Sequence, residues 1–544
     1  MRALAALILF AASLAAQRFE ISWPKPLDGH VVLILSTSSS GEPRFQVSEG
    51  LNTQQMFGAD VDGARSVTID SVALGYPLAH LNQVPAGEYT VQAVLNIYET
   101  FYRADGRSVK LPMDQGEGQH WNRKPGNLYS APAKMKVEPG SSATLRIQLD
   151  KTIPPIEPPQ DTKYIKHVRI QSKLLTAFWG RPMYLGAVVL LPEGFDEHPG
   201  ARYPVLYRQG HFAATFNGFR TEPRPSPNGI DYAYKLYQDW TSGRLPHMII
   251  VTTQDANPYY DDSYAVNSAN LGPYGDAIVQ ELNPYIEKTF RAIGQPWARV
   301  LYGGSTGGWE ALAQQVFHPD YYNGAWVACP DPIDFHAYSL INLYEDKNAF
   351  YAAGPWKHVP QPMQRQVDGR ITSVMEDAIR YELVLGAKGR SGEQFDIWQA
   401  VYSPVGEDGY PAPILDPWTG VIDHKAAEYW KEHYDLVHII ERDWKTLGPQ
   451  LIGKLHFAVG DSDNYYLDRA VRLAEKFLES TKEPGKGPYY GGSFEYGVGA
   501  GHGYSGGPPG PESSGTIHQR LMPVMLQWML KTAPAGADVK SWRY

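Results

Sequence analysis

The 544-residue sequence has one cysteine, Cys329, no block of basic residues, and no long apolar run after its N-terminal segment. One cysteine excludes an internal disulfide and a cysteine-based zinc site. Lys and Arg number 49 against 58 Asp and Glu, so the net charge is −9 and nucleic acid is an unfavoured partner. Because no later segment approaches the ~20 apolar residues of a membrane helix, no integral membrane association is expected.

The N-terminal segment has the three parts of a secretory signal. Met1 and Arg2 give a basic start, residues 3–12 are apolar, and small residues follow at 13–16. This order predicts a signal peptide over residues 1–16 and a secreted or periplasmic protein. The alternative is a buried N-terminal strand.

The next region is rich in strand patterns. Residues 18–150 contain short runs of alternating apolar and polar residues, such as 19–23 and 30–35, separated by turn signals. This pattern predicts a β-sandwich domain. Residues 151–162 contain two Pro-Pro pairs and predict a stiff linker.

From residue 163 to residue 544 buried strands alternate with helical segments. Strands without polar alternation are expected where parallel strands are buried on both faces. They are predicted at 203–207, 248–252, 299–302, 325–328 and 455–459. The pattern predicts an α/β domain with a doubly wound, mostly parallel sheet. An aromatic-rich stretch at about 336–450, helical around 426–444, interrupts it and reads as a lid-like insertion.

A glycine-rich turn carries the strongest chemical signal. Gly303, Ser305 and Gly307 form a G-x-S-x-G motif between a predicted strand and a helical pattern at 310–317. A serine on such a tight turn projects its hydroxyl, and the glycines leave room for the turn. We expect Ser305 to be a nucleophile, and the alternative is a structural glycine turn.

A serine nucleophile needs a base and an orienting carboxylate. His502 is flanked by glycines in a loop just before the C-terminal helical pattern at 517–531, so it can reach back over the strand ends. Asp463 follows the last predicted buried strand, and the order Ser, Asp, His matches the hydrolase order. Asp461 lies on the same turn and stays an alternative to Asp463 as the acid; Asp468 ranks behind both.

The oxyanion of an acyl-transfer intermediate needs two backbone donors. The amide of Thr306, which follows the serine, is one expected donor. The loop after strand 203–207 contains Gly210, which permits close backbone approach, so His211 is the second. Residues on loops at the same sheet edge are expected to contact substrate: Gln209, Phe212, Tyr264, Asn267, Trp309 and Asp331.

Residues 164–532 resemble the esterase D-type esterases of the α/β-hydrolase superfamily, which include feruloyl and enterochelin esterases and S-formylglutathione hydrolase. The segments that carry the resemblance are 190–195, 202–207, 275–287, 303–309, 459–463 and 501–503. The resemblance implies that Ser305, Asp463 and His502 form a catalytic triad. It also suggests feruloyl or acetyl esters of carbohydrate as substrates.

The sequence therefore predicts a secreted serine carboxylic-ester hydrolase that forms an acyl-enzyme. No cofactor is expected, and no metal, because no acidic cluster has a metal-loop spacing. The expected partner is a small-molecule or polysaccharide-linked ester. Alternatives are a prolyl-oligopeptidase-like peptidase, an acyltransferase, or a secreted carbohydrate-binding protein on an inactive hydrolase scaffold.

Overall fold

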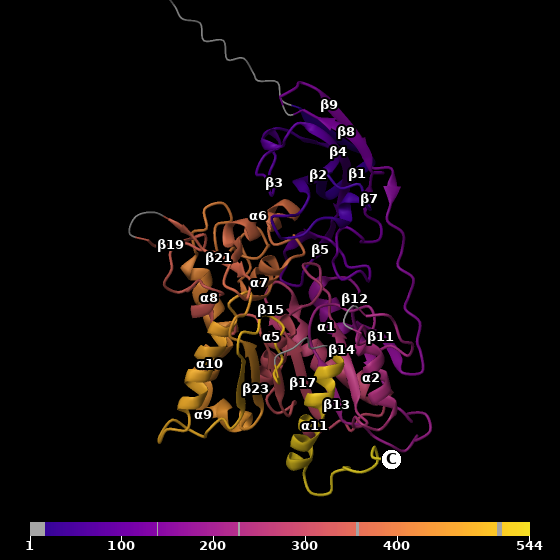
Figure 1. Cartoon of the computed structure of the whole chain (residues 1–544), viewed down its shortest axis with the longest axis vertical. Coiled ribbons are helices and arrows are strands. Elements are labelled where there is room, and N and C mark those ends of the chain that lie inside the picture. The colour runs from indigo at the N-terminus through magenta and orange to yellow at the C-terminus, as the bar shows by residue number, and fades with distance from the viewer. Residues whose placement is uncertain (1–16, 139, 227–228, 355–357, 509–513) are drawn as a thin grey trace, which may run out of the picture.

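The computed structural model describes residues 17–138, 140–226, 229–354, 358–508 and 514–544 (Figure 1). The expected signal segment, 1–16, lies outside them. A sheet-rich N-terminal region stands above a mixed α/β region, and an insertion flanks both. Across the described ranges, none of the helices combines the length and apolar character needed to span a bilayer.

The N-terminal region is built mainly on one bent, hydrogen-bonded sheet. Its central strand β1 (Arg18–Ser36) pairs antiparallel with β2 (Gln55–Ile69) and β4 (Gly87–Ile97). Register shifts around Leu27 bend β1, so the two runs predicted at its ends form one strand. The other strands of this sheet are β3 (Gly75–Tyr76), β7 (Leu128–Tyr129), β8 (Ala133–Val137), β9 (Thr144–Gln148) and β10 (Lys151–Thr152), and a separate two-stranded sheet contains β5 (Glu99–Tyr102) and β6 (Ser108–Leu111). The concave face encloses an apolar core that includes Phe19, Leu33 and Val91.

A second apolar cluster joins this sheet to the insertion through helix α6 (Met375–Leu385). Tyr76 of β3 and Tyr381 of α6 pack edge to face, with ring centroids 5.5 Å apart. Polar contacts reinforce the packing: His30 Nε2 lies 2.8 Å from the carbonyl oxygen of Val384. The N-terminal sheet and the insertion are therefore packed directly against each other.

The α/β region is built on an eight-stranded sheet in the order β11-β12-β14-β13-β17-β18-β23-β24. β11 and β12 are antiparallel to their neighbours, and the other pairs are parallel. The strands are β11 (Ile165–Ser172), β12 (Met183–Leu190), β13 (Val205–Arg208), β14 (Ile249–Gln254), β17 (Arg299–Gly304), β18 (Ala325–Ala328), β23 (Leu455–Gly460) and β24 (Ser493–Gly497). The predicted buried strands are confirmed, whereas β24 has no apolar run and was not predicted.

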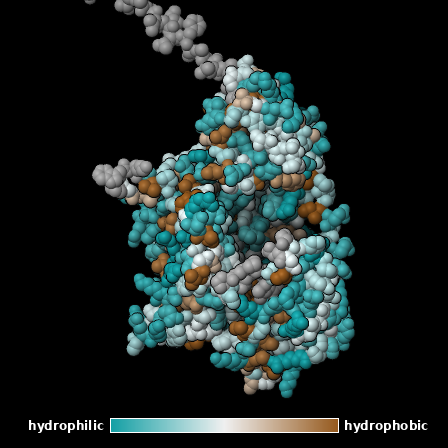
Figure 2. All heavy atoms as spheres, viewed as in Figure 1, coloured by the Kyte–Doolittle hydropathy of each residue, from teal (hydrophilic) through white to brown (hydrophobic). Residues whose placement is uncertain are grey.

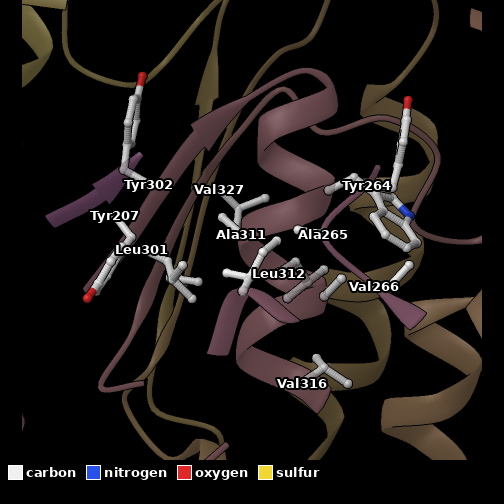
Figure 3. Close-up of a cluster of buried hydrophobic side chains, with 14 of the residues drawn as sticks. Tyr207, Tyr264, Ala265, Val266, Leu301, Tyr302, Ala311, Leu312, Val316 and Val327 are labelled. Carbon is white, nitrogen blue, oxygen red and sulfur yellow. The ribbon is translucent and has the colours of Figure 1, made fainter. Parts of the chain in front are cut away.

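Helix α5 (Thr306–Phe317) is buried along almost its whole length against this sheet. Ala311, Leu312 and Val316 of α5 face Leu301 and Val327 of the strands (Figure 3). Further helices surround the sheet: α1 (Lys173–Trp179), α2 (Tyr232–Thr241), α3 (Tyr274–Ala277), a π-helical turn (Ile278–Leu282), α4 (Asn283–Thr289), α10 (Asp468–Ser480) and α11 (Ser514–Thr532).

Most buried apolar side chains of the insertion between β18 and β23 join the apolar core of the central sheet. Besides α6 the insertion contains α7 (Gln394–Tyr402), α8 (His424–Tyr434) and α9 (Leu436–Leu451). The helical stretch predicted at 426–444 is broken at Asp435, whose side chain accepts a hydrogen bond from the His438 amide and caps α9. Its aromatic residues pack on one another, for example Tyr402 on Trp430 at 5.2 Å between ring centroids.

Candidate active site

Ser305 occupies the turn between β17 and α5 in a strained backbone conformation. Its φ is 58° and its ψ −124°, which a non-glycine residue rarely adopts. A Cβ on Gly303 would collide with the Gly307 carbonyl, and one on Gly307 would collide with the Gln209 carbonyl. The two glycines of the motif are therefore required by backbone packing, and the strained turn exposes the serine side chain.

The structure brings Ser305, His502 and Asp463 into one hydrogen-bonded chain. Ser305 Oγ lies 2.9 Å from His502 Nε2, and His502 Nδ1 lies 2.9 Å from Asp463 Oδ2. Asp463 is fully buried, and its other oxygen accepts hydrogen bonds from the amides of Tyr465 and Leu467 at 2.8 and 3.3 Å. These amides hold the Asp463 carboxylate so that its Oδ2 points toward His502 Nδ1.

The pKa of His502 reflects this arrangement. Burial alone would lower it, but the hydrogen bond and charge of Asp463, with a further contribution from Asp331, raise the pKa above the usual histidine value. The imidazole thus becomes a stronger proton acceptor while it faces the serine hydroxyl.

Asp461, the alternative acid, has a different environment. Its Oδ1 accepts a hydrogen bond of 2.7 Å from the Gly499 amide and stabilises the turn that carries His502. Asp468 begins α10 and pairs with Arg472 at 3.2 Å. Neither carboxylate contacts the imidazole, and only Asp463 does so among the described residues.

The two expected oxyanion donors lie on neighbouring segments. Among the described residues, neither the amide of Thr306 nor that of His211 has a hydrogen-bond acceptor within the protein. Gly307, beside Thr306, packs on the backbone of Gln209 and Gly210, which brings the two segments together. Both amides are thus available to an external oxygen.

A buried network of polar side chains contacts the turn that carries Ser305. Asp331 accepts hydrogen bonds from the Thr306 hydroxyl at 3.0 Å and the Tyr264 hydroxyl at 2.6 Å, and its Oδ1 lies 3.4 Å from Ser305 Oγ. Burial raises the pKa of Asp331, against the hydrogen bond from Tyr264. Gln394 and Trp398 of α7 both donate to the Tyr264 hydroxyl. The insertion therefore supports the site, through residues that no motif marked.

The remaining predicted substrate contacts differ in position. Trp309 is fully buried against Tyr264, so it packs beneath the site. Gln209 is buried, with its carbonyl against Gly307. Asn267 donates to Asp276 at 3.0 Å and is not part of the network. Phe212 lines a cavity of about 740 Å³ between β12, residues 113–116 and the linker. On the face seen in Figure 2, the surface is hollowed near its centre.

His211 projects from the loop after β13 between two aspartates. Its Nδ1 lies 3.2 Å from Asp261 Oδ1 and 3.4 Å from Asp262 Oδ2, and its Nε2 lies 3.4 Å from the Thr306 hydroxyl. Burial lowers the pKa of His211, but the two aspartates outweigh it and raise the pKa to about 11. This group and a second one, Asp334, His336 and Asp435, have the donor spacing of a metal site.

The segment around the strained serine matches a known family. Residues 183–377 match the model of a family described as Putative esterase. The esterase segment includes Ser305 and Asp331, while Asp463 and His502 follow it in the chain. The match over this segment indicates a carboxylic ester hydrolase.

Solved esterases resemble the chain at low identity. A ferulic acid esterase is 17% identical over 67% of this chain and 99% of its own, with a TM-score of 0.37. S-formylglutathione hydrolase from Agrobacterium tumefaciens is 12% identical over 69% and 98%, with a TM-score of 0.34. A ferulic acid esterase from Anaeromyces mucronatus is 12% identical over 68% and 92%, with a TM-score of 0.27. TM-scores this low establish neither the fold nor the substrate of this chain. No curated protein matches the chain.

Proposed function

We propose that this esterase hydrolyses carboxylic esters through an acyl-enzyme on Ser305, with His502 as the base and Asp463 as its orienting acid. The observation that supports the proposal most strongly is the chain of two 2.9 Å contacts from Ser305 through His502 to Asp463. Nucleophile, base and orienter within hydrogen-bond reach are the geometry that serine catalysis needs.

In the first half of the reaction His502 Nε2 accepts the proton of the Ser305 hydroxyl as Oγ attacks the ester carbonyl. Asp463 holds the proton on Nδ1 and stabilises the imidazolium that forms. The oxyanion accepts hydrogen bonds from the amides of Thr306 and His211. His502 then protonates the departing alcohol, which leaves the acyl group on Ser305.

In the second half water replaces the alcohol. His502 takes a proton from the water, the hydroxide attacks the acyl carbonyl, and the same two amides stabilise the second oxyanion. Transfer of the proton from His502 to Ser305 Oγ releases the acid and restores the resting enzyme. The N–H of Thr306 is well placed for both oxyanions because it opens α5, where the helix dipole also favours negative charge.

The finer assignments belong to the same proposal. The signal pattern at 1–16 supports export, the strand-rich region 18–150 is assigned to the β-sandwich class, and residues 151–162 link it to a catalytic domain at 163–544. Feruloyl or acetyl esters of carbohydrate are the substrates that the sequence resemblance favours. Phe212, on the loop that carries His211, also lines a cavity of about 740 Å³ that could hold part of such a substrate.

The decisive experiment compares wild type with Ser305→Ala and, as a matched control, Ser462→Ala, which alters a serine on the neighbouring turn. The panel contains short and long nitrophenyl esters, methyl ferulate, acetylated xylan and a peptide amide. We expect ester turnover and fluorophosphonate labelling in wild type and Ser462→Ala, and a loss of at least about a thousandfold in Ser305→Ala. Equal turnover in Ser305→Ala would refute the nucleophile.

A further inference from the structure

We propose that His211, Asp261, Asp262 and Glu310 bind one divalent metal ion beside the serine turn. The site is separate from the chain of Ser305, His502 and Asp463, and it does not depend on the proposed ester hydrolysis. Its four residues come from three elements: the loop after β13, the loop after β14, and helix α5. This origin explains why no metal-loop spacing appears in the sequence.

The spacing of the donors fits a single ion. One nitrogen of His211 and one oxygen each of Asp261 and Asp262 all lie within 4.8 Å of one another. The separations from His211 Nδ1 are 3.2 Å to Asp261 and 3.4 Å to Asp262. Two ligands on one ion at ~2.1 Å each are about 3.0–3.5 Å apart, depending on the geometry. The donors of His211, Asp261 and Asp262 are therefore already near the separations that a shared ion requires.

Glu310 gives the second, independent observation. It lies one turn of α5 after Thr306, is 1% exposed, and its side chain meets that of Asp262. In the described part of the chain, Glu310 Oε1 and Asp262 Oδ2 have no hydrogen-bond donor. A buried carboxylate oxygen without a donor is costly, and a cation satisfies two such oxygens at once.

Acidic side chains outnumber basic side chains around this group. Burial and the neighbouring carboxyl groups of Asp262, Asp255 and Asp261 raise the pKa of Glu310. His211 is the only basic side chain among the described residues that pairs with Asp261 or Asp262. Glu310 forms no ion pair with a described basic residue. A divalent cation would compensate this excess of negative charge.

The other histidine–aspartate group, Asp334, His336 and Asp435, lacks this second feature. The carboxylate of Asp435 already accepts hydrogen bonds from the amides of Phe335 and His438 and from the Tyr344 hydroxyl. Its oxygens are satisfied within the protein, so it provides a control of similar composition.

One imidazole with three carboxylates favours an ion that accepts both nitrogen and oxygen donors. Mn²⁺ and Zn²⁺ meet this requirement better than Mg²⁺ or Ca²⁺, which prefer oxygen. Bound there, the ion would connect the His211 loop to α5. It would thereby fix the backbone that holds the two available amides of Thr306 and His211.

The test measures metal binding to the full chain after chelator treatment and dialysis, by calorimetry with Mn²⁺ and with Zn²⁺ and by electron paramagnetic resonance of Mn²⁺. We expect one equivalent to bind and the unfolding temperature to rise. Glu310→Gln and Asp261→Asn should each weaken binding by at least about tenfold. His336→Gln is the matched control for His211→Gln, because the two side chains are 47% and 48% exposed, and only His211→Gln should weaken binding.

Absence of saturable binding up to about 1 mM of either ion would overturn the proposal. So would wild-type affinity in both Glu310→Gln and Asp261→Asn, or a loss of binding in His336→Gln. Circular dichroism without metal checks that each variant is folded, and if Glu310→Gln is not, Asp261→Asn decides. Binding is repeated in Ser305→Ala, which should retain it, so failure of the metal site and failure of the proposed hydrolysis are distinguishable.

Discussion

Asp463 and Asp461 lie on the same turn after β23, but their side chains serve different partners. Asp463 is fully buried and meets His502, whereas Asp461 accepts a hydrogen bond from the Gly499 amide. The sequence predicted Asp463 as the acid on this turn and kept Asp461 as an alternative. Which of two nearby aspartates turns inward depends on the path of the backbone, and a residue pattern does not contain that path.

Replacement of the two aspartates separates their roles. We expect Asp463→Asn to lower kcat by roughly three to four orders of magnitude, because the amide no longer holds the required imidazole tautomer. Asp461→Asn keeps the shape of the turn and should remain within ~threefold of wild type. Steady-state kinetics on a nitrophenyl ester measure both, and a larger loss in Asp461→Asn would reverse the assignment.

The raised pKa of His502 predicts the pH dependence of the reaction. Only the neutral imidazole accepts the serine proton, so activity falls as the pH drops through the pKa of His502. Because Asp463 raises this pKa, the acidic limb of kcat/KM should lie above the ordinary histidine value of about 6.5. The residual activity of Asp463→Asn should show the limb at lower pH. A limb at the same pH in both proteins would contradict this account.

Between elements, the turn from β17 to α5 depends on the close contact of Gly307 with the backbone at Gln209. A methyl group there meets main-chain atoms, which cannot rotate away. Gly307→Ala should therefore lower the free energy of unfolding by about 1–3 kcal/mol and reduce kcat. Gly304→Ala is the matched control, because its nearest neighbours lie at 3.8 Å, an ordinary contact. Denaturant unfolding and ester kinetics check the pair; equal effects would mean that the contact is unimportant.

Strands with a strong local residue pattern could be predicted from the sequence. Strands and contacts that depend on residues far away in the chain could not. The strands at 299–302, 325–328 and 455–459 are recognisable because burial on both faces leaves uninterrupted apolar runs. Exposed and half-exposed residues alternate along most of β24 (Ser493–Gly497), so it has no apolar run. Its place in the sheet comes from pairing with β23. Gln394 likewise carries no motif, because its link to Tyr264 joins residues 130 positions apart.

At the scale of the whole molecule, the N-terminal sheet and the insertion share one apolar cluster and direct polar contacts. The Gly58 backbone in β2 comes so close to the Val384 carbonyl of α6 that a Cβ would collide with it. Sequence reasoning assigned these two regions separately, because the contact joins positions more than three hundred residues apart.

A methyl group at this contact should therefore loosen the assembly. We expect Gly58→Ala to lower the free energy of unfolding by about 1–3 kcal/mol. Gly50→Ala, in the same region with no atom near the added methyl group, should stay within ~0.5 kcal/mol of wild type. Calorimetric unfolding distinguishes the two, and an unchanged unfolding temperature in Gly58→Ala would mean that the regions are not tightly packed.

The insertion leaves from one strand of the central sheet and returns on the strand beside it. Residues 329–454 separate β18 from β23, yet Ala325 pairs with Leu455 in the parallel ladder. The entropy cost of closing a loop grows only with the logarithm of its length, so this point of the fold tolerates segments of very different size. A segment of another length could therefore close the same gap between β18 and β23, but it would have to supply a substitute for the contacts of Gln394 and Trp398 with the Tyr264 hydroxyl.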